Sequence, residues 1–153
     1  MCSSDLARLP EFQLTRPRNV VEAVAAKHQS PNSQFIAGGT DLLVNMRRGI
    51  KTADMLIDLT GIDELSRIEV GDKGASIGAG VQIARLLDHP ILKGKYVAVA
   101  DACEQIAGPG HRVAGTVGGN LCLDTRCIYY NQSEWWRSAN KYCLKHRGDT
   151  CHV

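Results

Sequence analysis

The sequence predicts a fold of the α/β or α+β class, built from small sheets. Over residues 1–110, short runs typical of strands alternate with runs of helical periodicity. A chain of 153 residues is long enough for one ordinary domain with a core, or for two small lobes. The hydrophobic share of 44% and the charged share of 22% are those of a soluble globular protein.

Composition also limits the partners and the compartment. A net charge of +2 indicates neither nucleic acid nor a membrane surface as a partner. No stretch approaches the ~20 apolar residues of a membrane span, and residues 1–10 lack a signal-peptide pattern. Without such a signal, six cysteines favour thiols, or metal or cluster ligands, over a disulfide framework. We therefore expect a cytoplasmic protein.

The first elements are marked by local signals. Asn19, with Glu22 three residues later, resembles a capping box and predicts a helix from residue 20. A short buried strand is expected at residues 34–37, running into a Gly-Gly pair. A second helix starts at residues 40–41, ends at Gly49 and places three side chains inward, namely Leu42, Leu43 and Met46.

The next predicted elements are a strand at residues 55–59 and a hairpin with strands at 66–70 and 75–80. A short helix follows, with Ile83, Leu86 and Leu87 on one face. A longer helix is then predicted from apolar residues at helical spacing, which are Leu92, Tyr96, Val99, Cys103 and Ile106. On this spacing Cys103 is a core residue.

Two glycine-rich loops are the first candidates for a binding site. Residues 36–41 place paired glycines between a strand and a helix start, where glycine allows a close approach to a ligand and helix amides favour a phosphate. Residues 108–120 hold five glycines, more than a plain connector needs. Neither loop fits the dinucleotide fingerprint or the P-loop. Together they suggest a pyrophosphate gripped from two sides, although each loop alone is also explained as a structural turn.

The loop sequences resemble a known family. Ala-Gly-Gly-Thr-Asp-Leu (37–42) and Thr-Val-Gly-Gly-Asn-Leu (116–121) resemble the two flavin loops of the FAD-binding subunits of molybdenum hydroxylases, the family of xanthine dehydrogenase and carbon monoxide dehydrogenase. The resemblance runs from about Leu9 onward. It implies FAD as cofactor and an α+β fold of the PCMH/vanillyl-alcohol oxidase type, with two small α/β lobes, the second truncated. It assigns FAD contacts to Ile36, Ala37, Gly38, Gly39, Thr40, Asp41, Thr116, Gly118, Gly119 and Asn120.

One position departs from the family pattern. The family often has Arg-Asn before the second loop, where this sequence has Arg112-Val113. The difference leaves Arg112 as a neighbour of flavin or phosphate and removes one amide contact.

The last 32 residues are unusual in composition. They hold four of the six cysteines and five of the eight aromatic residues. The string from Cys127 to Tyr142 resembles an insert of the flavin subunits of 4-hydroxybenzoyl-CoA reductases, which carries an additional [4Fe–4S] cluster. The resemblance implies three ligands, Cys127, Cys143 and Cys151. Because a [4Fe–4S] cluster needs four thiolates, the fourth is expected beyond Val153, in a chain that continues past the printed sequence.

Other interpretations of this segment remain open. Cys122 directly follows the second glycine motif, where relatives without a cluster also have cysteine, so it is the less favoured ligand. Zinc is the competing metal, although the spacings of 4, 15 and 7 intervening residues lack a short knuckle. The aromatic residues suit either a small core or a shield for a cluster. The basic residues, among them Arg137, either offset the charge of a cluster or form a solvated face.

These observations define the expected organisation and function. Residues 1–60 form a first FAD-binding lobe, 61–121 begin a second, and 122–153 are an incomplete iron–sulfur insert. The resemblance implies an electron-transfer subunit of 4-hydroxybenzoyl-CoA reductase, with a molybdopterin-binding large subunit, a [2Fe–2S] small subunit and ferredoxin as electron donor. No residue pattern indicates a catalytic nucleophile or carboxylate dyad, as suits a protein whose cofactor performs the redox step.

Two alternative functions are retained. One is the FAD subunit of another hydroxylase of the xanthine dehydrogenase or carbon monoxide dehydrogenase type. The other, from a different class, is a zinc-stabilised, non-catalytic nucleotide-binding module.

Overall fold

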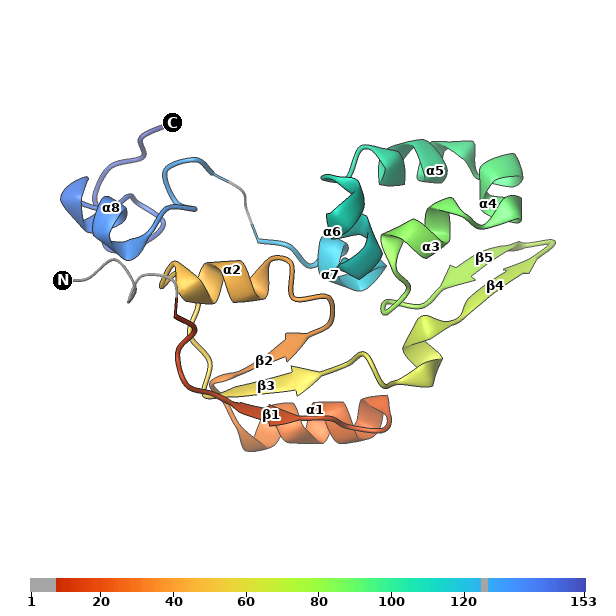
Figure 1. Ribbon diagram of the computed structural model, residues 1–153, viewed down its shortest axis with the longest axis horizontal. Coiled ribbons are helices and arrows are strands. Elements are labelled where there is room, and N and C mark those ends of the chain that lie inside the picture. The colour runs from red at the N-terminus through yellow and green to blue at the C-terminus, as the bar shows by residue number, and fades with distance from the viewer. Residues whose placement is uncertain (1–7, 125–126) are drawn as a thin grey trace.

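The computed structural model describes residues 8–124 and 127–153. Its first lobe is a three-stranded parallel sheet with two crossover helices (Figure 1). The strands β1 (Gln13–Thr15), β2 (Ser33–Ile36) and β3 (Met55–Asp58) lie in the order β1-β3-β2. The central strand is the most apolar, and its Leu56 and Ile57 are buried, because a strand paired on both edges lies inside the lobe.

The crossover helices of this lobe begin and end where the sequence predicts. In α1 (Val20–Gln29), the Asn19 side chain accepts a hydrogen bond from the Glu22 amide at 2.8 Å, which confirms the cap. In α2 (Leu42–Arg47), Met46 is buried, and Gly49 follows the helix with a φ of +64°. Strand β1 was not predicted from the sequence, because three residues are too few to show a periodic pattern.

The second lobe combines a hairpin with five short helices. A 3-10 turn, η2 (Asp63–Ser66), leads into β4 (Ile68–Gly71) and β5 (Gly74–Ile77), which pair antiparallel as expected. The helices are α3 (Ile83–Leu87), α4 (Pro90–Lys95), α5 (Val97–Glu104), α6 (Pro109–Ala114) and α7 (Val117–Leu121). Their core is Val81, Ile83, Leu86, Leu92 and Cys103. The prediction for Cys103 is confirmed, and burial raises the pKa of its thiol.

Two predictions for this lobe were wrong in detail. The single longer helix is divided into α4 and α5, because Tyr96 leaves helical geometry at φ −124° and ψ 50°. The apolar spacing is unaffected, since both helices pack on the same core. Residues 108–120 are not a loop but contain α6, with Pro109 in its first turn, and α7, with Thr116 as its N-cap. Their high glycine content concealed the caps.

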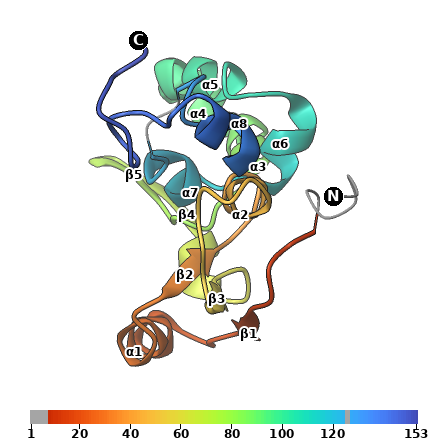
Figure 2. The ribbon, with the colours of Figure 1, turned by 90° about the vertical axis from the view of Figure 1, so that its left-hand side faces the viewer.

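The cysteine-rich insert, residues 127–153, contains one helix, α8 (Glu134–Ala139), capped by the Ser133 side chain. In Figures 1 and 2, α8 lies at the C-terminal end of α2, whereas α6 and α7 lie near the N-terminal end of α2. Within the described part of the chain, no helix is long and apolar enough to cross a membrane.

Candidate functional site

The fold brings the first glycine motif into direct contact with the segment that leads into the second. A Cβ built on Gly38 would overlap with the carbonyl group of Ala114, the last residue of α6. A Cβ built on Gly118, within the second motif, would lie 2.6 Å from the Cβ of Ala79. Only glycine fits at such close approaches. The turn after β2 therefore lies against the end of α6, which precedes the second motif (Figure 1). That both motifs contact one FAD molecule remains a prediction.

The first motif keeps its hydrogen-bond donors available. Gly39 has a φ of +67°, and the turn that it makes leads into α2. Within residues 8–124 and 127–153, the backbone amides of Gly38, Gly39 and Thr40 donate to no protein oxygen. Residues 36–39 are half-buried and Thr40 is exposed. A glycine turn with free, accessible amides fits the phosphates of FAD.

Most backbone amides of the second motif donate hydrogen bonds to oxygens of the protein itself. Val117 N donates to Val81 O at 2.9 Å, and Gly118 N donates to Ala79 O at 2.7 Å. Gly119 N donates to the Thr116 hydroxyl oxygen at 3.2 Å. Asn120 N likewise donates within the helix turn, to Thr116 O, whereas the half-buried Asn120 side chain has no hydrogen-bond partner in the part of the chain that the structure describes. FAD contacts from this motif therefore remain a prediction, to be made by side chains and by close approach of backbone.

The Arg112 side chain donates hydrogen bonds to backbone carbonyl groups of the protein. Its Nη1 donates to the carbonyl oxygens of Glu104, Ile106 and Ala107 at 2.9, 3.1 and 2.9 Å. These carbonyls end α5, and Ala107 has a positive φ of 45°. Arg112 therefore caps α5 and holds the chain that enters the second motif.

Asp58 is a residue beside the first glycine motif to which the sequence analysis gave no role. It ends β3 beside Ile36, the last residue of β2, and so adjoins the first glycine motif. Its Oδ1 accepts from the Thr60 amide (3.0 Å) and hydroxyl (2.6 Å), and its Oδ2 accepts from Arg16 Nε (3.2 Å). Burial opposes ionisation, but the hydrogen bonds from Thr60 and the Arg16 charge outweigh it, so the pKa of Asp58 is lowered. Its place at the carboxyl end of a parallel strand is the signal in the sequence.

The predicted cluster ligands lie in the insert but are not gathered there. Cys127 and Cys143 are half-buried, and Cys122 and Cys151 are exposed. Across the two described segments, no group of three His, Cys, Asp or Glu side chains is placed to hold a metal ion. Cys127 N donates to Asn131 Oδ1 at 2.8 Å, and the Cys143 carbonyl accepts from His146 N and Gly148 N. The thiols thus sit in hydrogen-bonded turns, in an arrangement that does not itself fit a cluster or zinc.

Other side chains of the insert serve its own packing. His152 Nε2 lies 2.7 Å from the Tyr142 carbonyl oxygen. Tyr130 is buried, whereas Trp135 is 69% exposed and is not part of a core. Arg137 is only 2% exposed, so it is not part of a solvated face. Burial, together with the charges of Arg137 and Arg147, lowers the pKa of His146 against the opposing effect of Glu134.

Comparison with known proteins gives the family. Residues 10–134 match the model of the FAD binding domain in molybdopterin dehydrogenase. The chain belongs to this family. The α+β FAD-binding fold and FAD as the cofactor of the family are thereby confirmed, whereas residues 135–153 lie outside the match.

Similar proteins of the FAD binding domain family are subunits of several oxidoreductases. The chain is 37% identical over 120 residues to the aldehyde oxidoreductase FAD-binding subunit of Escherichia coli (strain K12), covering 78% of this chain and 37% of that subunit. It is 31% identical over 115 residues to the nicotinate dehydrogenase FAD-subunit of Eubacterium barkeri, covering 74% and 39%. A solved carbon monoxide dehydrogenase from Hydrogenophaga pseudoflava matches with a TM-score of 0.72 at 33% identity, covering 74% and 40%. The chain thus spans about two fifths of the length of these relatives.

Proposed function

We propose that this chain is part of the FAD-carrying electron-transfer subunit of a molybdenum-dependent oxidoreductase. The observation that carries the proposal is the contact of Gly38 with Ala114, just before the second glycine motif, together with the free amides of the first motif, in a chain of the FAD-binding family. The partners would be a molybdopterin-binding large subunit and a [2Fe–2S] small subunit. The names of similar proteins support this, since one of them is a carbon monoxide dehydrogenase medium chain.

The residues of this chain would bind and orient the cofactor. FAD, when bound, supplies the redox chemistry. The amides of the first motif would donate to its phosphates, and the Asn120 side chain would offer a further amide. Asp58 holds the turn after β3 beside the first motif through Thr60 and Arg16. No proton-transfer residue is required of this chain.

The insert extends the proposal. We infer from its resemblance that it carries a [4Fe–4S] cluster and that the enzyme is a 4-hydroxybenzoyl-CoA reductase with ferredoxin as electron donor. The ligands would be Cys127, Cys143 and Cys151, with a fourth thiolate from beyond Val153. Because these thiols are not gathered in the structure, cluster assembly requires the turns that carry them to rearrange.

The same resemblance supports a division into residues 1–60, 61–121 and 122–153. The packing adds one refinement at the first boundary. Ile62 and Leu65 pack with Ala23 and Ile57 of the first lobe, so η2 belongs with that lobe energetically.

Metal and cofactor analysis tests the proposal. The full-length subunit, purified without oxygen, should contain FAD together with one equivalent of a four-iron cluster and its acid-labile sulfide. FAD with less than one equivalent of cluster iron would refute the cluster and the ferredoxin entry point. Zinc without iron or sulfide would favour a zinc-stabilised nucleotide-binding module.

An activity assay on the assembled complex separates the remaining alternative. Reduction of 4-hydroxybenzoyl-CoA with reduced ferredoxin would support the finer assignment. Oxidation of a purine, an aldehyde or carbon monoxide, without that reduction, would assign the chain to another hydroxylase of the family.

A further inference from the structure

The insert is joined to the first lobe by two reciprocal hydrogen bonds between arginine and carbonyl groups. Arg48 Nη1, just after α2, donates to the Asn131 carbonyl oxygen at 2.8 Å. In the opposite direction, Arg137 Nη2 donates to the Gly49 carbonyl oxygen at 2.9 Å. Two adjacent residues of the lobe therefore contact the insert, one as donor and one as acceptor.

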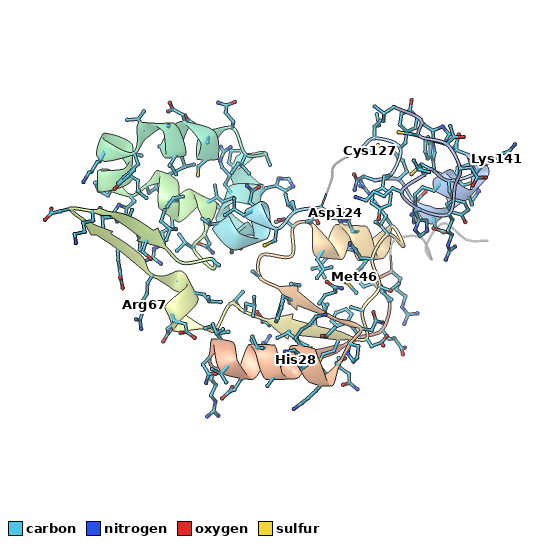
Figure 3. All side chains as sticks on the ribbon, turned by 180° about the vertical axis from the view of Figure 1, so that it is seen from behind. His28, Met46, Arg67, Asp124, Cys127 and Lys141 are labelled. Atoms are coloured by element: carbon cyan, nitrogen blue, oxygen red, sulfur yellow. The ribbon has the colours of Figure 1, made fainter. Side chains whose placement is uncertain are left out.

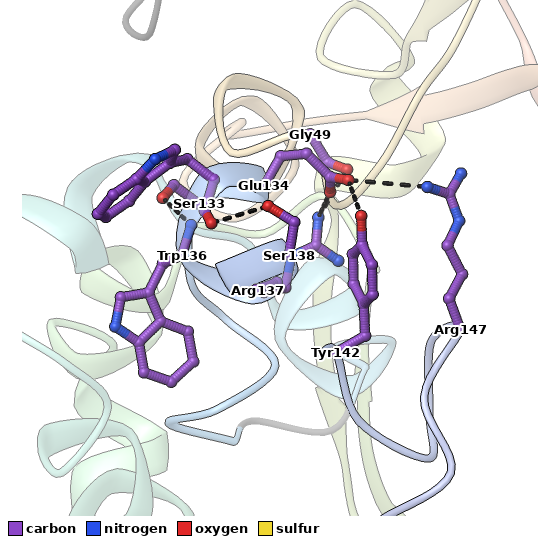
Figure 4. Close-up of polar contacts among 9 residues, drawn as sticks. Gly49, Ser133, Glu134, Trp136, Arg137, Ser138, Tyr142 and Arg147 are labelled. Atoms are coloured by element: carbon purple, nitrogen blue, oxygen red, sulfur yellow. Dashed lines mark hydrogen bonds and ion pairs between the residues drawn. The ribbon is translucent and has the colours of Figure 1, made fainter. Parts of the chain in front are cut away.

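Arg137 is the buried member of this pair. Its Nη2 also donates to Glu134 Oε2 at 2.7 Å (Figure 4), and its guanidinium lies 5.9 Å from the centre of the Tyr130 ring. Nε and Nη1 have no partner among the residues that the structure describes. Burying a charge is unfavourable unless it is paired and hydrogen-bonded. The Gly49 carbonyl of the first lobe supplies an acceptor that α8 alone does not.

These contacts extend to the two turns that carry cysteines. The backbone carbonyl of Asn131 accepts the hydrogen bond from Arg48, and its side-chain oxygen accepts one from the Cys127 amide. Tyr142, the residue before Cys143, donates its amide to the Arg137 carbonyl at 2.8 Å and its hydroxyl to Glu134 Oε1 at 2.9 Å. None of these bonds involves a thiol group, so each of them leaves the thiols available to a metal.

A charged bridge lies beside this pair. Asp124 contacts Lys51 of the first lobe at 3.6 Å and Lys145 of the insert at 2.6 Å. Figure 3 shows Asp124 near α2, with Cys127 and Lys141 in the insert beyond it. The two lysine ammonium groups thus share one carboxylate across the junction.

We propose that Arg48 and Arg137 are positioning residues that fix the cysteine-bearing insert on the end of α2 before any metal binds. Helix α2 has six residues and is about 9 Å long. The first glycine motif lies at its other end (Figure 1). The insert and the flavin loop are therefore held at the two ends of one short helix. The consequence rests on the proposed function: the insert would remain at this end of α2 while its cysteine-bearing turns rearrange around a cluster.

The test uses the full-length subunit in its complex, as isolated and after treatment with a chelator. The variants are Arg48→Gln and Arg137→Gln, with Arg47→Gln as the matched control, since Arg47 is an exposed neighbour with no recorded bond to the insert. A short amine-reactive cross-linker should join Lys51 to Lys145 in the wild type and the control. We expect this cross-link to be lost in both test variants, and tryptic cleavage at Lys141 to accelerate roughly tenfold, the effect of losing one charge-assisted hydrogen bond.

Two readouts separate positioning from simple stabilisation of α8. Arg48→Gln lies outside the insert and at an exposed position, so it leaves α8 intact while releasing the insert. Arg48→Lys, which keeps a donor, should restore part of the cross-link. If Arg48→Gln cross-links and is cleaved like Arg47→Gln, the proposal is wrong. Iron content is measured separately. If the protein contains no iron but its cross-link still depends on Arg48, the proposed cluster is wrong and the positioning role of Arg48 is supported.

Discussion

At the scale of single residues, the contact between the first glycine motif and the segment before the second depends on the missing side chain of Gly38. The backbone carbonyl of Ala114 occupies the space that a Cβ would need. Because Ala114 is the last residue of α6, its backbone cannot move away as a flexible side chain would.

Replacement of this glycine is therefore expected to disrupt the site. Gly38→Ala should separate the two motifs, lower the FAD content of the full-length subunit and reduce the free energy of unfolding by about 2 kcal/mol, as overpacking does. Flavin absorbance per protein and urea denaturation measure the two effects. Gly61→Ala is the matched control, because a Cβ there meets nothing within 4 Å. Equal FAD content in the two variants would contradict the expectation.

Asp58 makes a second prediction at this scale, on the dependence of stability on pH. Its pKa is lowered in the folded chain, so its ionised form stabilises the fold above the ordinary carboxyl pKa, and this contribution is lost as pH falls through the lowered value. The stability difference between wild type and Asp58→Asn should therefore be largest near neutral pH and shrink in acid. Thermal unfolding from pH 7 to pH 3 measures it.

A partial variant provides the control for Asp58. Thr60→Ala removes the hydroxyl donor at 2.6 Å but retains the Thr60 amide bond, so it should show a smaller loss of the same sign. A difference between wild type and Asp58→Asn that stays constant with pH would show that the carboxylate is not preferentially stabilised by these partners.

At the scale of elements, capping and turn residues in the sequence correctly predicted the helix ends and the hairpin that they determine. The Asn19 cap, the Gly49 stop and the hairpin turn act over a few residues, and all three are present in the structure. The break between α4 and α5 was not predictable, because one apolar stripe can continue across two helix axes. The hydrogen bonds that the amides of the second motif donate to Ala79 and Val81 were also not predictable, since these carbonyl groups approach the motif only in the folded chain.

Arg112 shows how an element end is stabilised by a residue from the next element. Arg112→Gln removes the group that donates to three carbonyl oxygens after α5. We expect a loss of about 2 kcal/mol in the free energy of unfolding, as for hydrogen bonds made by a charged group, and faster amide exchange at the end of α5. Arg67→Gln, at an exposed position with no recorded side-chain bond, is the control. Unchanged exchange in α5 would exclude the capping role.

At the scale of the whole molecule, α2 joins the two regions of interest. One end adjoins the first glycine motif and the other adjoins the insert (Figure 1). The hydrogen bonds that make the second junction link residues 83 and 88 positions apart in the chain. A single sequence carries no sign of such a pairing, so the placement of the insert had to come from the structure.

The last prediction concerns whether residues 1–153 contain enough of the flavin site to bind FAD. The chain spans about two fifths of the length of its relatives, and the free donors described above are backbone amides of the first glycine motif. Hydrogen bonds from such amides to phosphate give weak binding in water, because each of them replaces a hydrogen bond to water. Residues 1–153 alone should therefore bind FAD weakly or not at all, whereas the full-length subunit should bind it tightly. Titration of FAD, followed by calorimetry and flavin fluorescence, measures both. Tight, stoichiometric binding by residues 1–153 would show that the two motifs and their surroundings form the complete site.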